Sequence, residues 1–475
     1  MIRATKIVAT LGPASHAPQT LARMLAAGVD VVRLNFSHGR ADEHVERASN
    51  VRAAAKELGR EVGIMVDLQG PKIRIGKFEA GEALLEPGQR FVLDTDAAPG
   101  DASRVGLDYK ELVHDVGPGA VLLLDDGLIR LTVESVEGPR IVTRVDVGGM
   151  LSNNKGINRM GGGLTAPALT AKDMEDMKTA AAIDADYLAV SFPKNKEDMY
   201  MARQLLRAAG GNALLIAKIE RAEAIGALAE IIEASDGIMV ARGDLAVEVG
   251  NAVVPGLQKR MIRMAREHNK LTITATQMME SMIHNPVPTR AEVSDVANAV
   301  LDGTDAVMLS AETASGRYPV ETVETMAQVC VEAEKSHLVE LERDFLNRTF
   351  TRIDQSIAMA TLFTASHLKV KAIAALTQSG STALWISRHN CDCPIYALTS
   401  EIRSLRRMSL YRNVSPLPLE QHDDRDELLQ SAEDLLLATA HVQRGDLIVL
   451  TVGEPIGKSG GTNTMKIVRV GEHRA

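Results

Sequence analysis

Lys218 and Glu220 stand two residues apart at the end of the apolar run ALLIAKIE, and Asp244 ends the next apolar run, DGIMVARGD. Residues two apart in a β-strand point to the same side, so this ammonium and carboxylate would share one face. The second carboxylate would arrive at the tip of the neighbouring strand. Two carboxylates beside a fixed cation suit a divalent metal ion and a phosphorylated, anionic substrate. A pair of buried salt bridges is the structural alternative.

Eight short β-rich runs of this kind occur along the chain. Helical patterns such as PQTLARMLAAG and TVETMAQVCVEAEK lie between most of them, and this alternation predicts a parallel sheet covered by helices. Eight such units, almost continuously apolar, favour an α/β fold of the closed TIM (β/α)8 barrel type. The runs are 5–12, 29–37, 62–70, 185–192, 213–220, 236–244, 271–279 and 305–313.

Polar residues gather at the C-terminal ends of these runs and would meet on one rim of the barrel. That rim is where barrel enzymes keep their active sites. An open doubly wound sheet is the alternative architecture, although no G-x-G-x-x-G motif follows the first run. The rim residues are Arg33, Asn35, Ser37, Asp67, Lys218, Glu220, Asp244, Thr276 and Ser310.

Two further segments extend the barrel pattern. Residues 71–165 contain short alternating segments broken by turns, which predicts a small inserted β-barrel domain. Such a cap could close on a substrate and exclude water, with MGGGLTAP as its return hinge or as an ordinary linker. We expect a TIM barrel catalytic domain at 1–70 and 166–340, the cap at 71–165, and a C-terminal α/β domain at 341–475.

The C-terminal domain carries a candidate anion site. The stretch VKAIAALTQSGSTALWISR predicts a strand, a loop and a helix whose N-terminus is rich in hydroxyl groups and N–H donors. A simple N-cap cluster is the alternative. The loop GEPIGKSGGTNT is not predicted to be an ATPase P-loop, because three residues separate Gly453 from Gly457 where that motif needs four. The effector-phosphate residues would be Thr377, Ser379, Gly380, Ser381, Thr382 and Lys458.

Composition argues against several classes of function. The net charge of −9 and an aromatic content of 3% argue against a nucleic-acid partner. We expect no membrane span, because no apolar stretch reaches about 18 residues, and no signal peptide. Three cysteines make no disulfide framework and fit a reducing compartment. The Cys391–Cys393 pair has no further ligands beside it that would complete a metal site.

Several long motifs closely resemble those of the pyruvate kinase family. They include VVRLNFSHG, DLQGPKIR, NNKGIN, AKIERAEA, MVARGDLAVE and TITATQMMESM, and the match covers essentially the whole chain. The resemblance implies phosphoryl transfer from phosphoenolpyruvate to ADP, giving pyruvate and ATP. It also implies a cytoplasmic homotetramer that depends on Mg2+, with Mn2+ as a substitute, and nearest to the bacterial type activated by sugar monophosphates or AMP.

The resemblance also implies roles for individual residues. Glu220 and Asp244 would hold Mg2+, and the N–H groups of Gly243 and Asp244 would receive the substrate carboxylate. Lys218 would stabilise charge on the phosphoryl group and the enolate, and Arg33 would clamp the phosphate. Thr276 would lie near the enol carbon that gains a proton, with Ser310 in a relay. The nucleotide and a second Mg2+ would contact Asn35, Phe36, Ser37, His38, Arg74 and Lys155.

Two positions depart from the family pattern. Many members carry DTKGPE where this chain has DLQGPK, and these members need K+. Here Lys72 takes the place of the glutamate, and its ammonium could replace K+, so we predict that K+ is not strictly required. A solvent-facing Lys72 with K+ still bound is the alternative. Ala246 replaces a glycine and should be helical. The K+ ligands would be Asn35, Ser37, Asp67 and the Leu68 carbonyl.

Two other functions are open to a chain of this kind. A metal-dependent aldolase would use a similar acid pair, but it would leave Arg74, Lys155 and the cap without a purpose. A catalytically inactive sugar-phosphate sensor would keep the C-terminal anion site, but the intact set of rim residues argues against it. ADP-dependent formation of pyruvate distinguishes the predicted kinase from both.

Overall fold

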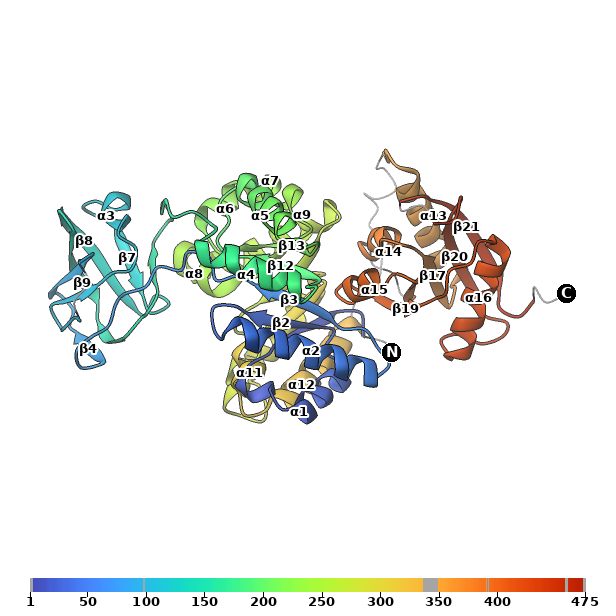
Figure 1. Cartoon of the computed structure of the whole chain (residues 1–475), viewed down its shortest axis with the longest axis horizontal. Helices are drawn as coiled ribbons and strands as arrows, with labels where there is room; N and C mark the ends of the chain where they lie inside the picture. The colour runs from blue at the N-terminus through green and yellow to red at the C-terminus, as the bar shows by residue number, and fades with distance from the viewer. Residues whose placement is uncertain are drawn as a thin grey trace.

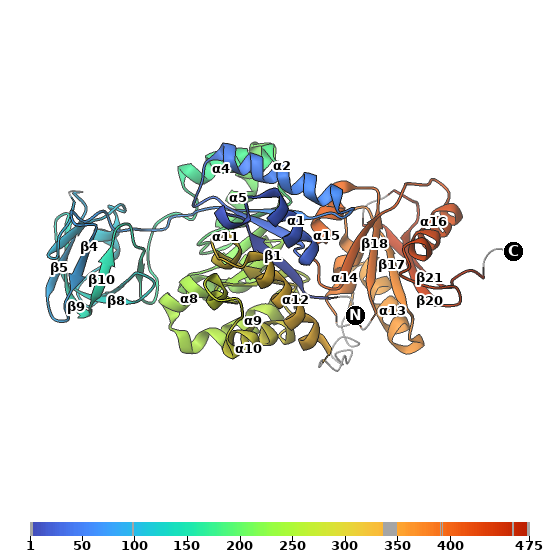
Figure 2. The ribbon, with the colours of Figure 1, turned by 90° about the horizontal axis from the view of Figure 1, so that it is seen from below.

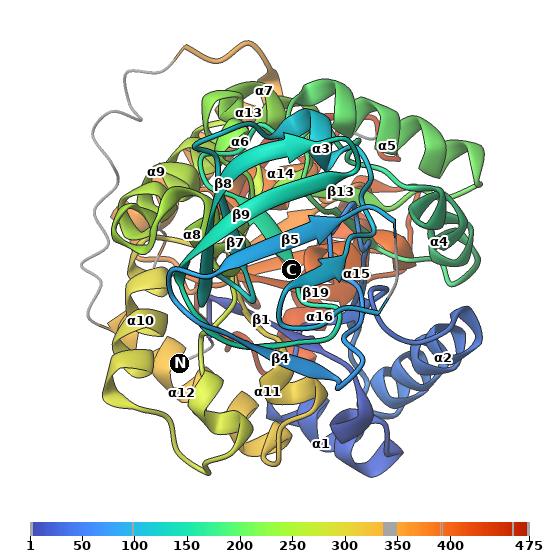
Figure 3. The same ribbon diagram turned by 90° about the vertical axis from the view of Figure 1, so that its left-hand side faces the viewer.

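The computed structural model describes residues 3–96, 99–335, 349–389, 391, 393–457 and 460–472. Three domains lie in a row along the longest axis of the molecule, with the barrel between an all-β insertion and a C-terminal α/β domain (Figures 1 and 2). In a view along this row from the side of the insertion, the helices of the barrel domain form a ring around the barrel strands (Figure 3). No helix among the described residues is long and apolar enough to cross a membrane.

The central domain is a closed parallel barrel of eight strands in the order β1-β16-β15-β14-β13-β12-β3-β2. Each of the eight predicted runs contains one of these strands, so the sequence prediction of a TIM barrel is confirmed. The strands are β1 (Lys6–Thr10), β2 (Val31–Asn35), β3 (Gly63–Asp67), β12 (Tyr187–Val190), β13 (Leu214–Ile219), β14 (Gly237–Ala241), β15 (Leu271–Ala275) and β16 (Ala306–Leu309).

Amphipathic helices cover the outside of the barrel. Side-chain caps fix where some of them begin: Thr170 and Asp173 form a capping box at α4, and Thr289 and Glu292 form one at α10. The covering helices are α1 (Pro18–Ala27), α2 (Ala41–Glu57), α4 (Ala171–Ala182), α5 (Lys196–Ala208), α7 (Leu228–Ala234), α9 (Val254–Glu267), α10 (Arg290–Leu301) and α12 (Pro319–Lys335). Shorter helices follow three strands at the C-terminal rim of the barrel: α6 (Ala222–Gly226), α8 (Arg242–Val249) and α11 (Ala311–Ala314).

Alternate residues of each barrel strand face opposite sides, as the pleat of a strand requires. Val8, Met65 and Ile216 belong to the cluster inside the barrel. Their chain neighbours Ile7 and Ala217 belong to the cluster between the strands and the helices. Both faces are apolar because both are buried, which explains the continuous hydrophobic runs in the sequence.

The chain leaves the barrel after β3 and returns before α4, and we keep 71–165 as the proposed extent of the insertion. Its described strands form a six-stranded mixed sheet, β11-β7-β8-β9-β5-β6, and a separate pair, β10-β4. The strands are β4 (Glu82–Leu85), β5 (Arg90–Asp94), β6 (Arg104–Gly106), β7 (Val121–Leu124), β8 (Ile129–Glu137), β9 (Arg140–Val147), β10 (Gly149–Ser152) and β11 (Ile157–Arg159), with one helical turn, α3 (Leu112–Asp115).

The C-terminal domain is a five-stranded sheet in the order β19-β18-β17-β20-β21, in which only β21 is antiparallel to its neighbour. The proposed boundary at 340/341 lies outside the described residues. The elements are α13 (Ile353–Leu368), β17 (Ala372–Leu376), α14 (Ser381–Ser387), β18 (Ile395–Thr399), α15 (Ile402–Met408), β19 (Val414–Pro418), α16 (Arg425–Ala438), β20 (Leu447–Gly453) and β21 (Thr462–Arg469).

Buried charges connect this domain to the end of the barrel opposite the C-terminal rim. Arg388, which follows α14, pairs with Asp305, which precedes β16, and both side chains are 1% exposed. Lys6 at the start of β1 donates to the Val414 carbonyl at 2.7 Å. The C-terminal domain therefore packs on the amino-terminal ends of the barrel strands, and the insertion lies at the other end.

Candidate active site

The site begins one layer above the apolar interior of the barrel. Thr10, Arg33, Asp67 and Lys218 each stand two residues after an inward-facing core residue, so they point into the same space. Glu220 continues this inward row just beyond the end of β13. The alternation that buries the core therefore also brings the polar side chains together at the rim.

Lys218 lies at the centre of this cluster and is 12% exposed. Its Nζ lies 2.9 Å from Glu220 Oε1 and 3.3 Å from Asp67 Oδ1, and it donates to Ser191 Oγ at 2.8 Å. Burial works to lower the pKa of Lys218, but Asp67 and Glu220 more than compensate and hold it above its ordinary value. The residue is thus a fixed, fully charged cation rather than a base.

Arg33 and Asp67 form a second ion pair, which shares Asp67 with the Lys218 cluster. Arg33 Nε donates to Asp67 Oδ2 at 2.6 Å, and another guanidinium nitrogen donates to Thr10 Oγ1 at 3.0 Å. Although burial works in the other direction, Lys218 and Arg33 hold the pKa of Asp67 below its ordinary value. Asp67 is therefore a buried carboxylate that orients two cations.

Glu220 and Asp244 supply the two carboxylates at adjacent strand ends, because β13 pairs with β14. Burial raises the pKa of Glu220; Lys218 opposes this rise and Asp244 adds to it. One Glu220 oxygen also accepts the Phe192 N–H at 3.0 Å. No group of three or more His, Cys, Asp or Glu side chains that could hold a metal ion occurs among the described residues. A cation here would need further oxygen ligands from a substrate or water.

Helix α8 starts at the rim and presents its first turn to the site. Gly243 donates its backbone N–H to Thr276 Oγ1 at 2.9 Å, which connects the ends of β14 and β15. Thr276 has a positive φ of 70°, a conformation that is uncommon for a β-branched residue. Ala246 lies inside α8 and is not among the residues with positive φ, so the predicted helical conformation is confirmed.

The groove beside this turn has an empty volume of about 1350 Å³ and contains both Thr276 and Ser310. Ser310 donates its N–H to Glu312 Oε2 at 2.6 Å. Glu312 is buried, and burial raises the pKa of its carboxyl. The turn of the inserted domain at Asp126 and Gly127 lines the same groove, so the insertion borders the site.

Lys72 does not lie where its proposed role requires. Its Nζ is 3.2 Å from Asp244 Oδ1, whereas the described partners of the Asp67 carboxylate include Lys218 and Arg33. Backbone pairing causes this placement: Ile75 donates to the Lys155 carbonyl, and the paired connecting strands carry Lys72 toward α8. The expectation that this ammonium sits among the oxygens of the K+ ligands is corrected.

The predicted nucleotide residues are spread over two domains. Asn35 Oδ1 accepts the Ser37 N–H at 3.1 Å, and the His38 carbonyl contacts His44. Phe36 is 2% exposed and its ring stacks on His44, so its side chain packs in the core and only its backbone can meet the nucleotide. On the insertion, Arg74 donates to the Asn154 carbonyl at 3.1 Å, and Lys155 pairs with Asp125 at 2.7 Å.

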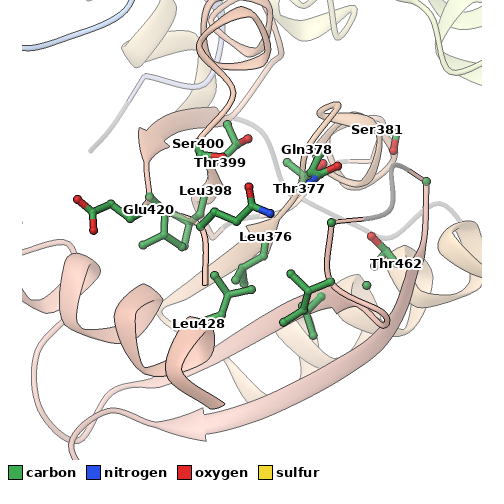
Figure 4. Close-up of a pocket in the computed structure, with 17 residues that line it drawn as sticks. Leu376, Thr377, Gln378, Ser381, Leu398, Thr399, Ser400, Glu420, Leu428 and Thr462 are labelled. Atoms are coloured by element: carbon green, nitrogen blue, oxygen red, sulfur yellow. The ribbon is translucent and has the colours of Figure 1, made fainter. Parts of the chain in front are cut away.

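The predicted anion loop borders a pocket of about 620 Å³ in the C-terminal domain. Thr377 and Ser381 line it, together with Thr399, Ser400 and the glycine-rich loop around Gly457 (Figure 4). Ser379, Gly380 and Thr382 do not line it, and Lys458 lies outside the described residues. Thr382 is 1% exposed and its hydroxyl bonds to Thr462 at 2.6 Å, so its proposed contact with an effector is corrected.

Sequence reasoning missed three polar residues of the site. Ser191 bridges Lys218 and the Leu68 carbonyl, Glu312 holds the Ser310 turn, and Thr10 receives Arg33. Thr10 and Ser191 each stand two residues after an inward-facing core residue, Val8 or Ala189. The alternation of inward and outward residues along the strands would therefore have identified them. Outside this site, Cys391 and Cys393 have sulfur atoms 3.2 Å apart.

Comparisons with known proteins identify the family of the chain. The family model for the pyruvate kinase barrel domain matches residues 2–323, and the model for the pyruvate kinase alpha/beta domain matches residues 355–468. The chain is 51% identical over 475 residues to pyruvate kinase II of Salmonella typhimurium, with 99% of each chain covered. It is 50% identical to pyruvate kinase of Haemophilus influenzae, covering 95% of this chain and 96% of that one.

A more distant relative is pyruvate kinase of Geobacillus stearothermophilus, which is 43% identical and covers 98% of this chain and 80% of its own length. Both family models and the full-length identity thus point to the same enzyme activity. The chain belongs to the pyruvate kinase family and is an enzyme that transfers a phosphoryl group from phosphoenolpyruvate to ADP.

Proposed function

We propose that Lys218, Glu220 and Asp244 form the centre at which this transfer takes place. The observation that supports the proposal most directly is the position of the Lys218 ammonium between Glu220 and Asp67 at the active rim. It is a cation held by carboxylates in a space that the barrel shields from water. Such a preorganised charge stabilises the charge that develops during transfer.

In the proposed reaction, the bond between phosphorus and the enol oxygen breaks, and a bond to a terminal phosphate oxygen of ADP forms. Lys218 stabilises the transferred group and the enolate left behind, while Arg33 holds the phosphate. The N–H groups at the start of α8 receive the substrate carboxylate. The enolate then takes a proton at its terminal carbon, beside Thr276 and Ser310, and becomes pyruvate.

Glu220 and Asp244 are the residues that would hold Mg2+, or Mn2+ in its place. The residues fit this role, because Mg2+ is usually bound by one or two carboxylates together with substrate oxygens rather than by a protein cage. The ion would supply positive charge to the substrate oxygens. Arg33, Lys72 and Lys218 balance the charges of Asp67, Glu220 and Asp244, so a dication would leave the site positive for an anionic substrate.

A coupled assay of pyruvate formation tests the function itself. The proposal requires that pyruvate appears from phosphoenolpyruvate only when both ADP and a divalent cation are present. An aldolase would form pyruvate or consume it without ADP. The nucleotide is proposed to bind between Asn35, Ser37 and His38 on the barrel and Arg74 and Lys155 on the insertion.

Activity without K+ is a further prediction. Lys72 places an ammonium against Asp244, where a glutamate would add negative charge to a site that already contains three carboxylates. A monovalent cation is therefore not needed to balance the site. We expect the rate in K+-free buffer with tetramethylammonium as the counter-ion to be at least half of that in about 100 mM KCl.

The variant Lys72→Glu is the matched test of this explanation. It should lose at least about tenfold in rate without K+ and recover most of the loss when KCl is added. Lys72→Met separates lost charge from added charge and should show a smaller dependence on K+. If the parent enzyme is inactive until K+ is supplied, K+ binds at the oxygens of Asn35, Ser37 and Asp67 and the prediction fails.

The pocket in the C-terminal domain is proposed to bind an allosteric sugar phosphate or AMP. Hydroxyl and amide side chains of Thr377, Gln378 and Ser381 border it, and the leucines Leu376 and Leu428 line another part (Figure 4). We expect ribose 5-phosphate, glucose 6-phosphate or AMP to lower the KM for phosphoenolpyruvate. Ser381→Asp should abolish this response and leave the unactivated rate within about twofold, because its carboxylate repels a phosphate. An unchanged response to the effector would show that the effector does not bind in this pocket.

The assembly and the compartment also belong to this proposal. We propose a cytoplasmic homotetramer on the basis of family membership. Analytical ultracentrifugation of the full chain tests the assembly, and a single species with the mass of one or two chains would contradict it.

A further inference from the structure

Glu248 lies where three segments of the molecule meet. It occupies the last turn of α8, one turn beyond Asp244, and its side chain is buried. Its Oε2 accepts the N–H of Ala222 at 2.8 Å, at the start of α6. Ala222 follows Glu220 by two residues, so one Glu248 carboxylate oxygen connects the two elements that carry Glu220 and Asp244.

The third segment belongs to the inserted domain. Asn158 in β11 lines the same pocket as Glu248 and lowers the pKa of its carboxyl, and the Glu248 backbone carbonyl accepts the Gly161 N–H at 3.1 Å. Arg221 donates to the Leu164 carbonyl at 3.2 Å, and Glu223 accepts the Gly163 N–H. The chain that returns from the insertion is therefore attached to α8 and to the start of α6 at several points within seven residues.

This attachment explains why three glycines occur in succession in MGGGLTAP. Gly161, Gly162 and Gly163 all have positive φ values, of 79°, 78° and 92°. A Cβ at Gly162 would lie 2.5 Å from Glu223 Oε2, so a side chain there would displace the Glu223 carboxylate from its contact with the segment. The return segment is thus shaped to lie against this junction rather than to act as a free linker.

Charged groups surround Glu248 from each side. Arg221 and Glu223 face it from the α6 side, Asp244 precedes it on its own helix, and Lys72 comes from the outgoing strand of the insertion. A pocket of about 290 Å³ that extends from Asp244 to Glu248 brings these elements together. Burial raises the pKa of Glu248 to about 7, with Glu223 adding to the rise and the Ala222 N–H and Arg221 opposing it.

We propose that Glu248 is a positioning residue for phosphoryl transfer: it fixes the returning strand of the inserted domain to the two elements that carry Glu220 and Asp244. The cap and the two carboxylates then keep one relative geometry, which a bridging substrate requires. The inference rests on the proposed roles of Glu220 and Asp244. It adds a residue that touches neither substrate nor ion.

Because Glu248 ionises near neutral pH, the effect of replacing it should depend on pH, whereas the effect of losing a purely structural contact should not. The folded pKa of about 7 lies above the unfolded value of 4.5. The stability that the protonated carboxyl contributes is complete below about pH 4.5 and is lost as the pH rises through about 7. The carboxylate present above pH 7 costs stability, but it accepts a stronger hydrogen bond from the Ala222 N–H than a neutral group does.

The experiment compares the full-length enzyme with Glu248→Gln at about pH 6 and pH 8.5. At pH 8.5, kcat/KM for ADP should fall by about tenfold. This is the size of effect found for residues that orient ligating side chains without touching the ligand themselves. At pH 6 the loss should be less than about threefold, because the parent carboxyl is then also neutral. Hydrogen exchange of the amides in 157–164, corrected for the intrinsic rate, should accelerate in the variant at pH 8.5 only.

Thermal denaturation separates positioning from plain stability. At pH 8.5 the amide removes a buried charge, so Glu248→Gln should melt no lower than the parent while its activity falls. Glu230→Gln, on α7 and away from the site, is the control and should change neither property. Equal losses of activity at both pH values, or a lower melting temperature with unchanged exchange, would overturn the inference. Glu220→Gln should be inactive at both pH values, and its failure to be so would instead overturn the proposed site.

Discussion

Replacing Lys218 by Met should lower kcat by about three orders of magnitude, the range found when a preorganised charge is removed from a transition state. The KM for phosphoenolpyruvate should change by less than about threefold. Lys218 is bound to Asp67 and Glu220 before any reaction, so it is held in place to meet charge that develops later. In the proposed mechanism, Arg33 and the start of α8 still bind the substrate in its ground state.

Methionine keeps the length of the side chain and removes its charge, but it leaves Asp67 and Glu220 with less compensation. Circular dichroism and melting temperature must therefore accompany the kinetics. Lys196→Met, which breaks an exposed ion pair with Glu230 on the barrel surface, is the control and should keep full activity. A folded Lys218→Met enzyme with near-normal kcat would remove Lys218 from the mechanism. A change confined to KM would make it a binding residue only.

Replacing Arg388 by Met should cost about 3–5 kcal/mol, because it leaves the Asp305 carboxylate buried without its partner. Arg388 donates to Asp305 Oδ2 and to the Lys270 carbonyl, both at 2.8 Å. Asp305 also receives the Thr272 N–H at 2.9 Å, which fixes it between β15 and β16. Although burial works in the other direction, Arg388 holds the pKa of Asp305 below its ordinary value. The stability that the pair contributes is therefore present at neutral pH and is lost as the pH falls through that lowered pKa.

The same domain interface contains an exposed pair that serves as a control. Arg403 and Asp184 lie 3.1 Å apart with 55% and 45% of their side chains exposed, so Arg403→Met should cost less than about 1 kcal/mol. Thermal denaturation of both variants at pH 7 gives the comparison. The double variant Arg388→Met with Asp305→Asn removes the unpaired charge and keeps an oxygen that accepts the Thr272 N–H, so it should recover part of the loss. Equal melting temperatures for Arg388→Met and the parent would show that the buried pair does not hold the two domains together.

Much of the fold could be predicted because the barrel strands obey a simple rule. Both faces of each strand are buried, so the eight runs are mostly apolar and their charged residues lie near the ends. Every second residue of a strand faces the same side, so Arg33 faces inward because Val31 does. In the same way, Lys218 and Glu220 face inward because Ile216 does. The convergence of the site was therefore present in the spacing of residues along the chain.

The contacts that sequence reasoning missed depend on long-range pairing. Lys72 meets Asp244 because two connecting strands from the ends of the insertion pair with each other, and no local pattern indicates that pairing. Phe36 and Thr382 stand beside functional residues, but neighbouring side chains bury them against His44 and Thr462.

Binding of Mn2+ to the full-length enzyme tests the central claim most directly, because it reports on the carboxylates without requiring turnover. Titration followed by electron paramagnetic resonance, in the presence of phosphoenolpyruvate, should show one tight site per chain in the parent enzyme. Glu220→Gln and Asp244→Asn should each weaken that site by at least about tenfold, and Glu230→Gln should leave it unchanged. Tight binding that survives both substitutions would show that these two carboxylates do not meet around one ion.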